Sequence, residues 1–236
     1  MGTAQHPPQV IVGARGFYAV WLPADPDAVA KLVPEGLTPA DGCPVFMNQY
    51  RVEDSTQTSS HGSEDAFGSY SLTYLGADLA GLNVNPDTPA RWWTHYINSS
   101  EPMARYAEAH GVPAVHSQAE STLEIDGSRY VGTTIVDGTP VIRTTARVEL
   151  GNLVRVNGQL RYITRVGGEF TSGRYAFVAD IAETLQLESI EFLDPNHPIY
   201  QLRPADPLTV TFGIWYEDMY FCYPGGEGPL GSTHGN

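Results

Sequence analysis

Short apolar runs that alternate with polar residues recur along the whole chain, and glycine and proline separate them. Alternation with a period of two is typical of strands that are buried on one face. Turn pairs such as Asp126-Gly127 and Asn157-Gly158 are typical of antiparallel hairpins between such strands. The pattern therefore predicts antiparallel strands over Gly16–Leu22, Pro44–Val52, Ser69–Leu75, Arg91–Asn98, Ser117–Ile125, Tyr130–Ile135, Val141–Leu150, Leu153–Val156, Gln159–Val166, Arg174–Val178, Leu187–Phe192 and Leu208–Tyr223.

Helical signals are few. Asp25-Pro26 supplies an N-cap and a first-turn proline for a helix that ends before Pro34. Ser100 caps a second helix that Gly111 ends, and a short third helix is expected after Asp180. We therefore predict an α+β fold that is mostly antiparallel β, with a few short helices packed on the sheet.

Length and charge narrow the function classes. The 236 residues contain no repeat and no linker, so we expect a single domain over residues 1–236, with residues 1–10 and 225–236 flexible. The 13 basic and 27 acidic residues leave a net charge of −14. This charge excludes nucleic acid and an anionic membrane as partners, because both need a basic surface. No run approaches the ~18–20 apolar residues of a membrane span, and Met1–Val10 is not a signal peptide, so we expect a cytoplasmic protein.

Motifs for cofactors and metals are absent from the sequence. It contains no GxGxxG or GxxxxGK[ST] phosphate loop, no GxSxG serine elbow and no HExxH zinc motif. Cys43 and Cys222 lie far apart and are expected to be free thiols. The His61–Asp65 segment has metal-ligating residue types, but a solvated polar loop is the commoner use of such a segment. We therefore expect neither a metal nor another cofactor.

The run Arg91–Asn98 carries the first candidate for chemistry. Alternation places Trp93, His95 and Ile97 on one face of a strand. A histidine beside tryptophan on a buried face is more often a core residue than a catalyst. Both interpretations of His95 therefore stand.

The run Val141–Leu150 carries the second candidate. Arg143, Arg147 and Glu149 share one face of this strand, and apolar residues occupy the other face. A solvated outer face is the favoured interpretation. The alternative is a barrel interior in which an arginine such as Arg143 binds a carboxylate.

Several segments occur in a family-specific order. Arg15-Gly16-Phe17-Tyr18 opens a strand, and the helix in Asp27–Leu37 ends in a Val-Pro-Glu-Gly-Leu turn. Glu101-Pro102 then begins a helix that leads to Gly111-Val112-Pro113, and His197–Pro204 precedes the last long strand. This order resembles the acetoacetate decarboxylase family over most of the chain. The resemblance implies a barrel-like α+β fold with an enclosed pocket, and a homo-oligomer (dimer or larger).

The resemblance does not extend to the family's chemistry. The family uses a Schiff-base lysine directly after the proline of a Gly-x-Pro-Lys-Lys motif, activated by desolvation and a neighbouring cation. Here Ala114 and Val115 occupy both lysine positions. The chain has one lysine, Lys31, which is expected on the surface of the first helix. The sequence therefore excludes a lysine Schiff base.

Other pocket positions of the family are matched one by one. Gln49, or Asn48 after a one-residue slip, stands at the position of a family glutamate, and Leu72 lies near a second one. Arg15 is retained at the family's pocket arginine. The resemblance thus implies a pocket in which neutral residues replace carboxylates.

His95, or Thr94 with a shifted gap, stands at a pocket methionine of the family. A titratable imidazole there would be able to move a proton. The resemblance therefore makes His95 and Arg15 the candidate catalytic pair, in which Arg15 polarises a carbonyl and His95 transfers the proton. The candidate contacts to substrate are Gln49, Leu72, Trp93, Ala114, Val115, Arg143 and Tyr216.

These residues predict a lysine-independent lyase, dehydratase or cyclase that acts on a β-keto or polyketide-like small molecule in natural product biosynthesis. The main alternative is a non-catalytic protein that binds a small molecule in the retained pocket. A third possibility is another inward-facing catalytic group: Tyr50, Glu120 or Glu149. The aromatic-rich last strand, which includes Tyr216, either lines the pocket or packs in the core.

Overall fold

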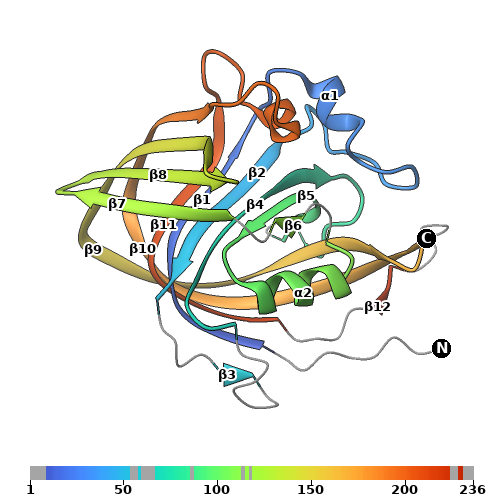
Figure 1. The fold of residues 1–236 in the computed structure, drawn as a ribbon, viewed down its shortest axis with the longest axis horizontal. Helices are drawn as coiled ribbons and strands as arrows, with labels where there is room; N and C mark the ends of the chain where they lie inside the picture. The colour runs from blue at the N-terminus through green and yellow to red at the C-terminus, as the bar shows by residue number, and fades with distance from the viewer. Residues whose placement is uncertain are drawn as a thin grey trace.

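The alternating runs join into one large sheet. The computed structural model describes residues 9–53, 58–59, 67–85, 88–112, 115–116, 119–223 and 228–230. The strands are β1 (Gln9–Trp21), β2 (Val45–Val52), β3 (Thr58–Ser59), β4 (Tyr70–Leu79), β5 (Ala90–Asn98), β6 (Val115–His116), β7 (Ala119–Asp126), β8 (Arg129–Val136), β9 (Thr139–Val166), β10 (Glu169–Phe192), β11 (Val210–Tyr223) and β12 (Gly228–Pro229). In this described part they form a 12-stranded sheet ordered β12-β10-β11-β1-β2-β4-β5-β9-β8-β7, with β3 on β1 and β6 on β5 (Figure 1).

Part of this sheet closes into a ring. Strand β9 pairs in parallel with β5, from Ala90↔Arg161 to Trp92↔Ile163, and also pairs antiparallel with β10. The path β10-β11-β1-β2-β4-β5-β9 therefore returns to its start. The mostly antiparallel α+β architecture is the predicted one, and the closed ring gives it an interior face.

The hairpin of β9 and β10 corrects three sequence predictions. The separate runs predicted between 141 and 192 merge into two long strands, and the segment after Asp180 is strand rather than helix. The expected Asn157-Gly158 turn lies inside β9, where Gly158 faces Phe177 of β10. A Cβ at Gly158 would lie 2.6 Å from Phe177 Cζ, so this glycine makes room for an aromatic ring rather than for a turn. Pairing over the full hairpin overrides the local helical signal.

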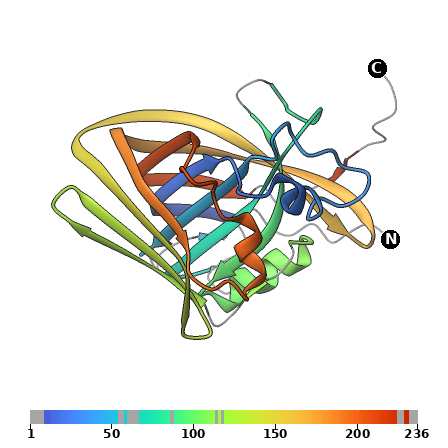
Figure 2. The same cartoon turned by 90° about the horizontal axis from the view of Figure 1, so that it is seen from above.

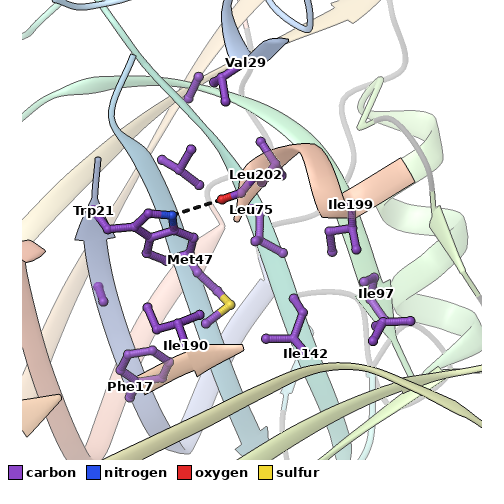
Figure 3. Close-up of a cluster of buried hydrophobic side chains, with 14 of the residues drawn as sticks. Phe17, Trp21, Val29, Met47, Leu75, Ile97, Ile142, Ile190, Ile199 and Leu202 are labelled. Atoms are coloured by element: carbon purple, nitrogen blue, oxygen red, sulfur yellow. Dashed lines mark hydrogen bonds between the residues drawn. The ribbon is translucent and has the colours of Figure 1, made fainter. Parts of the chain in front are cut away.

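A second layer covers the outer face of the ring. Strand β8 pairs with β7 on one side and with the first half of β9 on the other, and this half of β9 pairs with the second half of β10. We call the layer that these strands form the wing (Figures 1 and 2). The wing packs apolar residues such as Ile142 and Ile190 against Phe17, Met47 and Leu75 of the ring strands (Figure 3). We call this cluster the wing core.

Short helices close the ends of the wing core. Trp21 Nε1 donates a hydrogen bond to the Leu202 carbonyl, 3.0 Å away, in the 3₁₀ helix η2 (Pro198–Leu202). Helix α1 (Pro26–Ala30) begins at the predicted cap, because Asp25 Oδ1 accepts from the Ala28 N–H at 3.0 Å. The sequence therefore located this helix correctly.

Helix α2 (Glu101–Ala109) also begins and ends as predicted. Ser100 Oγ accepts a hydrogen bond from the Met103 N–H at 3.4 Å. Gly111 follows the helix with a φ of 73°, and a Cβ there would lie 2.2 Å from the Arg165 carbonyl oxygen. Only glycine fits this position without strain. Among the helices of the described ranges, none is long and apolar enough to cross a membrane.

Several expectations fall outside the described residues. These are the His61–Asp65 loop, Ala114, residues 1–8 of the N-terminal segment, and residues 225–227 and 231–236 of the C-terminal segment. Gln9 and Val10 belong to β1, and Gly228 and Pro229 belong to β12.

Candidate functional site

The interior of the ring contains a cavity of about 810 Å³, which is within the size range of small-molecule sites. Aromatic side chains dominate its wall, because the inward positions of β1, β2, β4, β10 and β11 carry rings. A smaller number of polar groups interrupts this apolar wall. The aromatic and polar residues of the wall include Tyr18, Asn48, Tyr50, Tyr74, Asp78, Arg91, Tyr175 and Phe221.

The charged part of the wall is a buried ion pair. Arg91 Nε donates to Asp78 Oδ1 at 2.9 Å, and the Arg91 side chain is only 7% exposed. The guanidinium carbon lies 4.9 Å from the centre of the Tyr18 ring and 5.0 Å from that of Phe46. Two aromatic faces and one carboxylate therefore hold this cation in place.

Two polar atoms beside this ion pair lack hydrogen-bond partners. Within the described residues, Arg91 Nη1 and the Tyr18 hydroxyl are buried and make no hydrogen bond. An unpaired buried polar group costs about 1–3 kcal/mol, so native proteins keep few of them. Both atoms belong to residues that line the same cavity. They are therefore candidates to bind a polar group of a ligand.

The protonation states at this end of the cavity are well defined. Burial opposes the charge on Arg91. The negative charge that Tyr18 gains when it loses its proton, together with the Asp78 carboxylate and its hydrogen bond, outweighs burial, so the pKa of Arg91 is raised. Burial also raises the pKa of Tyr18 well above its ordinary value, although the Arg91 charge partly offsets this. Arg91 is therefore a cation and Tyr18 a neutral phenol at physiological pH.

A chain of hydrogen bonds forms the second polar part of the wall. The Tyr216 hydroxyl donates to Asn48 Oδ1 at 2.6 Å, and Asn48 Nδ2 donates to the Tyr74 hydroxyl at 2.9 Å. The Tyr74 and Tyr175 hydroxyls lie 2.6 Å apart. Burial raises the pKa values of Tyr74 and Tyr216, so both phenols stay neutral. This chain fixes the orientation of the polar groups in an otherwise apolar wall.

A different polar cluster lies on the opposite face of the same strands. Gln49 Nε2 donates to Thr134 Oγ1 at 2.8 Å, and the Tyr130 hydroxyl donates to Gln49 Oε1 at 2.9 Å. Thr73 Oγ1 lies 2.6 Å from Ser121 Oγ and 2.7 Å from Thr134 Oγ1. Both polar atoms of the Gln49 side chain are thus bonded between the ring strands and the wing. The cluster is satisfied internally.

The candidate catalytic pair is widely spaced. Arg15 lies on β1, where its guanidinium is half-exposed and pairs with Glu217 at 2.8 Å. His95 is buried on β5, with Nδ1 at 3.0 Å from Thr94 Oγ1. The order β1-β2-β4-β5 separates them by three strand spacings, about 14 Å in all. The structure does not bring these two side chains together at one point.

A β-bulge corrects the expected grouping around His95. Leu75 pairs with His95 and Gly76 pairs with Trp93, so Thr94 is an extra residue in β5. Trp93 therefore points into the ring, whereas His95 shares the wing-side face with Ile97. Trp93 and Ile97 do not lie on one face, because the bulge reverses the alternation between them.

The predicted substrate contacts divide between the two faces. Leu72, Trp93 and Tyr216 belong to the cluster inside the ring, whereas Gln49 faces the wing. Arg143 is exposed on the outer face of the wing, together with Arg147 and Glu149, in agreement with the solvated-face interpretation. Val115 lies in β6, in register with Tyr96, and Ala114 is not among the described residues.

The three alternative catalytic groups lie in different parts of the fold. Glu120 and Glu149 are exposed, whereas Tyr50 is buried in the wall of the cavity. The Tyr50 hydroxyl lies 3.2 Å from that of Tyr70. Of these groups, Tyr50 is therefore the one that the fold places at the ring cavity.

The sequence reasoning missed Arg91, Asp78 and Tyr18 as site residues. One signal was present: Arg91 stands directly before two tryptophans at the start of a strongly apolar run. Arginine is rarely fully buried unless it is paired, so an arginine in such a run marks a buried ion pair or a ligand contact. No comparable local signal marks Tyr18 or Asp78. Among the described residues, no group of three or more His, Cys, Asp or Glu side chains gathers to hold a metal.

Comparison with known proteins identifies the fold. An acetoacetate decarboxylase structure superposes with a TM-score of 0.65 at 13% identity, covering 96% of this chain and 91% of that one. The enduracididine biosynthesis enzyme MppR, solved with the condensation product of pyruvate and imidazole 4-carboxaldehyde, gives 0.64 at 14% identity, covering 97% and 92%. An acetoacetate decarboxylase-like enzyme from Sphingomonas wittichii RW1 gives 0.62 at 15% identity, covering 95% and 93%.

No protein-family model and no curated protein matches the sequence. The structural matches nevertheless extend over nearly the whole chain. The chain therefore has the acetoacetate decarboxylase-like fold, as the order of its sequence segments predicted.

Proposed function

We propose that this protein is an enzyme without a Schiff-base lysine, and that it acts by acid–base chemistry on a carbonyl-bearing carboxylate in the ring cavity. The observation that carries the proposal is the pair of unpartnered buried groups, Arg91 Nη1 and the Tyr18 hydroxyl, in the wall of that cavity. The enzymes that share the fold support catalysis, and MppR is solved with a carbonyl condensation product. A lyase, dehydratase or cyclase in natural product biosynthesis fits these features.

In the proposed chemistry, Arg91 binds the carboxylate of the substrate and Tyr18 donates a hydrogen bond to its carbonyl oxygen. Asp78 lines the same cavity and is the nearest carboxylate to Arg91. It removes a proton next to the carbonyl, and the C–H electron pair moves to the carbonyl oxygen to form an enolate. Arg91 and Tyr18 stabilise that negative charge, and the proton returns from Asp78 when the enolate collapses.

This proposal moves the centre of the chemistry away from Arg15 and His95. Those residues lie on the outer face of the ring and on separate strands. An 810 Å³ cavity walled by Tyr50, Tyr175 and Phe221 also favours a substrate larger than acetoacetate, with a flat or aromatic part. We also propose that the protein is cytoplasmic and that it forms a homo-oligomer.

A non-catalytic binding protein is the second candidate. The observation that favours it is the state of the cavity phenols, because the raised pKa values of Tyr18 and Tyr74 keep both phenols protonated and unable to accept a proton. Among the described lining residues, Asp78 is then the one carboxylate that could act as a base. A binding protein would be stabilised by ligand and form no product.

The test uses one stable and one reactive probe. The stable probe is 4-oxo-4-phenylbutanoate with its methyl ester, and the reactive probe is 3-oxo-3-phenylpropanoate. We expect the acid to bind and raise the melting temperature, and the ester to bind at least tenfold more weakly, because it lacks the charge that Arg91 recognises. We expect the enzyme to exchange the C2 protons of the reactive probe for solvent deuterium above the enzyme-free rate, because Asp78 removes and returns such a proton.

The variants separate binding from folding. Tyr18→Phe removes a hydroxyl that has no partner, so stability should be unchanged while the acid binds about two- to tenfold more weakly. Arg91→Gln alone would leave Asp78 buried and unpaired, so it is combined with Asp78→Asn. The double variant should lose at least tenfold in affinity and all turnover, whereas Arg129→Gln, an exposed residue on the wing, should match the wild type. Equal affinity for acid and ester in a folded wild type would refute the role of Arg91.

A further inference from the structure

Two arginines face each other on the outer surface of the ring. Arg161 of β9 pairs directly with Arg174 of β10. Their neighbours Leu160 and Tyr175 line the ring cavity, so the alternation of a strand directs both arginines outward. Like charges directly opposite each other on neighbouring strands destabilise a sheet. Such a pair therefore needs a compensating interaction.

No acidic side chain supplies that compensation within the described residues. Arg161 Nε donates to Ser172 Oγ at 2.8 Å, and Arg161 Nη1 donates to the Leu82 carbonyl at 2.5 Å. Neither arginine forms an ion pair there, unlike Arg91 with Asp78 or Arg155 with Asp180. Burial and the neighbouring charge of Arg174 lower the pKa of Arg161, and no carboxylate opposes this shift.

These arginines line a groove of about 680 Å³, and the polar side chains beside them have donors to spare. Ser172 Oγ accepts from Arg161, so its own proton is available, and Asn83 Oδ1 accepts from the Ala90 N–H at 3.1 Å, which leaves the Asn83 amide hydrogens for the groove. Among the residues that the structure describes, the other lining residues are apolar and no lining side chain is acidic, in a chain with 27 acidic and 13 basic residues. A groove whose described side chains are positive is the opposite of what the composition of such an acidic protein predicts.

We propose that the groove between Arg161 and Arg174 is an anion-binding site that takes a phosphate group. Two guanidinium groups with further hydrogen-bond donors match the charge and the several oxygens of a phosphate better than those of a single carboxylate. The inference stands independently of the proposed function. The phosphate comes either from inorganic phosphate or from a phosphate monoester.

The groove also lies beside the ring cavity. Asn83 and Val84 line the groove, whereas Asn85 and Thr88 of the same segment line the cavity. Likewise Arg161 faces the groove and the preceding Leu160 faces the cavity. A phosphate monoester with a long organic arm bound here would have its arm close to the cavity.

Isothermal titration calorimetry at constant ionic strength tests the site, with inorganic phosphate, glycerol 3-phosphate, acetate and chloride as probes. We expect saturable binding of both phosphates to the wild type. Arg174→Gln should weaken it at least tenfold without loss of folding, because Arg174 is exposed. Arg174→Lys should retain part of the affinity, and Arg129→Gln should retain all of it. Tighter binding of glycerol 3-phosphate than of inorganic phosphate would identify a monoester as the ligand, and the reverse would identify the free ion.

Three results would overturn the proposal. The first is the absence of saturable heat with either phosphate in the wild type. The second is equal phosphate affinity in Arg174→Gln and the wild type, which would show a general salt effect. The third is acetate binding as tightly as phosphate, which would show that the groove does not select a phosphate group.

Discussion

At the scale of the residue, the proposed chemistry depends most on Arg91. It is a cation buried between two aromatic rings and a carboxylate, with one N–H group unpartnered among the described residues. Lys31 is the contrasting case: it is the one lysine of the chain, and it is exposed at the end of α1. The one side-chain amine of the chain is thus exposed, whereas a buried position in the cavity wall carries a guanidinium.

Replacing Lys31 tests this contrast directly. Lys31→Arg removes the one side-chain amine and keeps its charge, so we expect turnover of 3-oxo-3-phenylpropanoate within twofold of the wild type. Intact-mass analysis after borohydride reduction should show no adduct in either protein. An adduct that appears in the wild type and disappears in Lys31→Arg would contradict amine-independent chemistry.

The sequence predicted some residues of the site and not others, for a physical reason. The candidate contacts Trp93 and Tyr216 belong to the cluster inside the ring, and Arg143 lies on the solvated face that alternation favoured. Alternation was wrong in grouping Trp93 with Ile97. The partnership of Arg91 with Asp78 and Tyr18 depends on three strands that meet only in the folded sheet. Spacing along one strand carries no information about such contacts, because they depend on the register between strands.

At the scale of the element, one bulge decides which residues face the cavity. The extra residue Thr94 shifts β5 against β4, and this shift directs both Trp93 and Arg91 into the ring. Gly76 lies opposite the bulge, where a Cβ would be 1.9 Å from the Trp92 carbonyl oxygen and 2.9 Å from the Phe46 ring. The missing side chain at Gly76 therefore allows β4 and β5 to pair at this point.

Gly76→Ala should consequently destabilise the protein. Because the added methyl group would meet backbone, we expect a loss of about 3 kcal/mol in the free energy of unfolding, measured by urea denaturation. The matched control is Gly151→Ala in β9, where a Cβ would meet no atom within 4 Å. That control should stay within about 0.5 kcal/mol of the wild type. Equal stability of the two variants would show that the bulge does not need the glycine.

The sequence predicted the helix ends correctly, because they depend on local hydrogen bonds. It did not predict the turns and bulges that depend on pairing between strands. The Asp25 and Ser100 caps fixed the starts of both helices, because each cap bonds to a backbone N–H three residues ahead. The Asn157-Gly158 turn failed because the glycine serves Phe177 on the next strand. The bulge at Thr94 was not predicted, for the same reason: the glycine that allows it lies on β4.

At the scale of the whole molecule, one sheet separates two interiors. The wing side holds the closed hydrogen-bond cluster of Gln49, Thr73 and Thr134, whereas the ring side holds the cavity with Arg91 and Tyr18. Residues assigned by resemblance divide between these sides. A single substrate contacts one face of the sheet, so we place the ligand inside the ring.

A crystal structure of the protein with 4-oxo-4-phenylbutanoate tests that placement most directly. We expect ligand density inside the ring, with the carboxylate within hydrogen-bond distance of Arg91 and the ring of the ligand against the aromatic wall. Density between the ring strands and the wing, at Gln49 or Arg15, with an empty ring cavity, would contradict it.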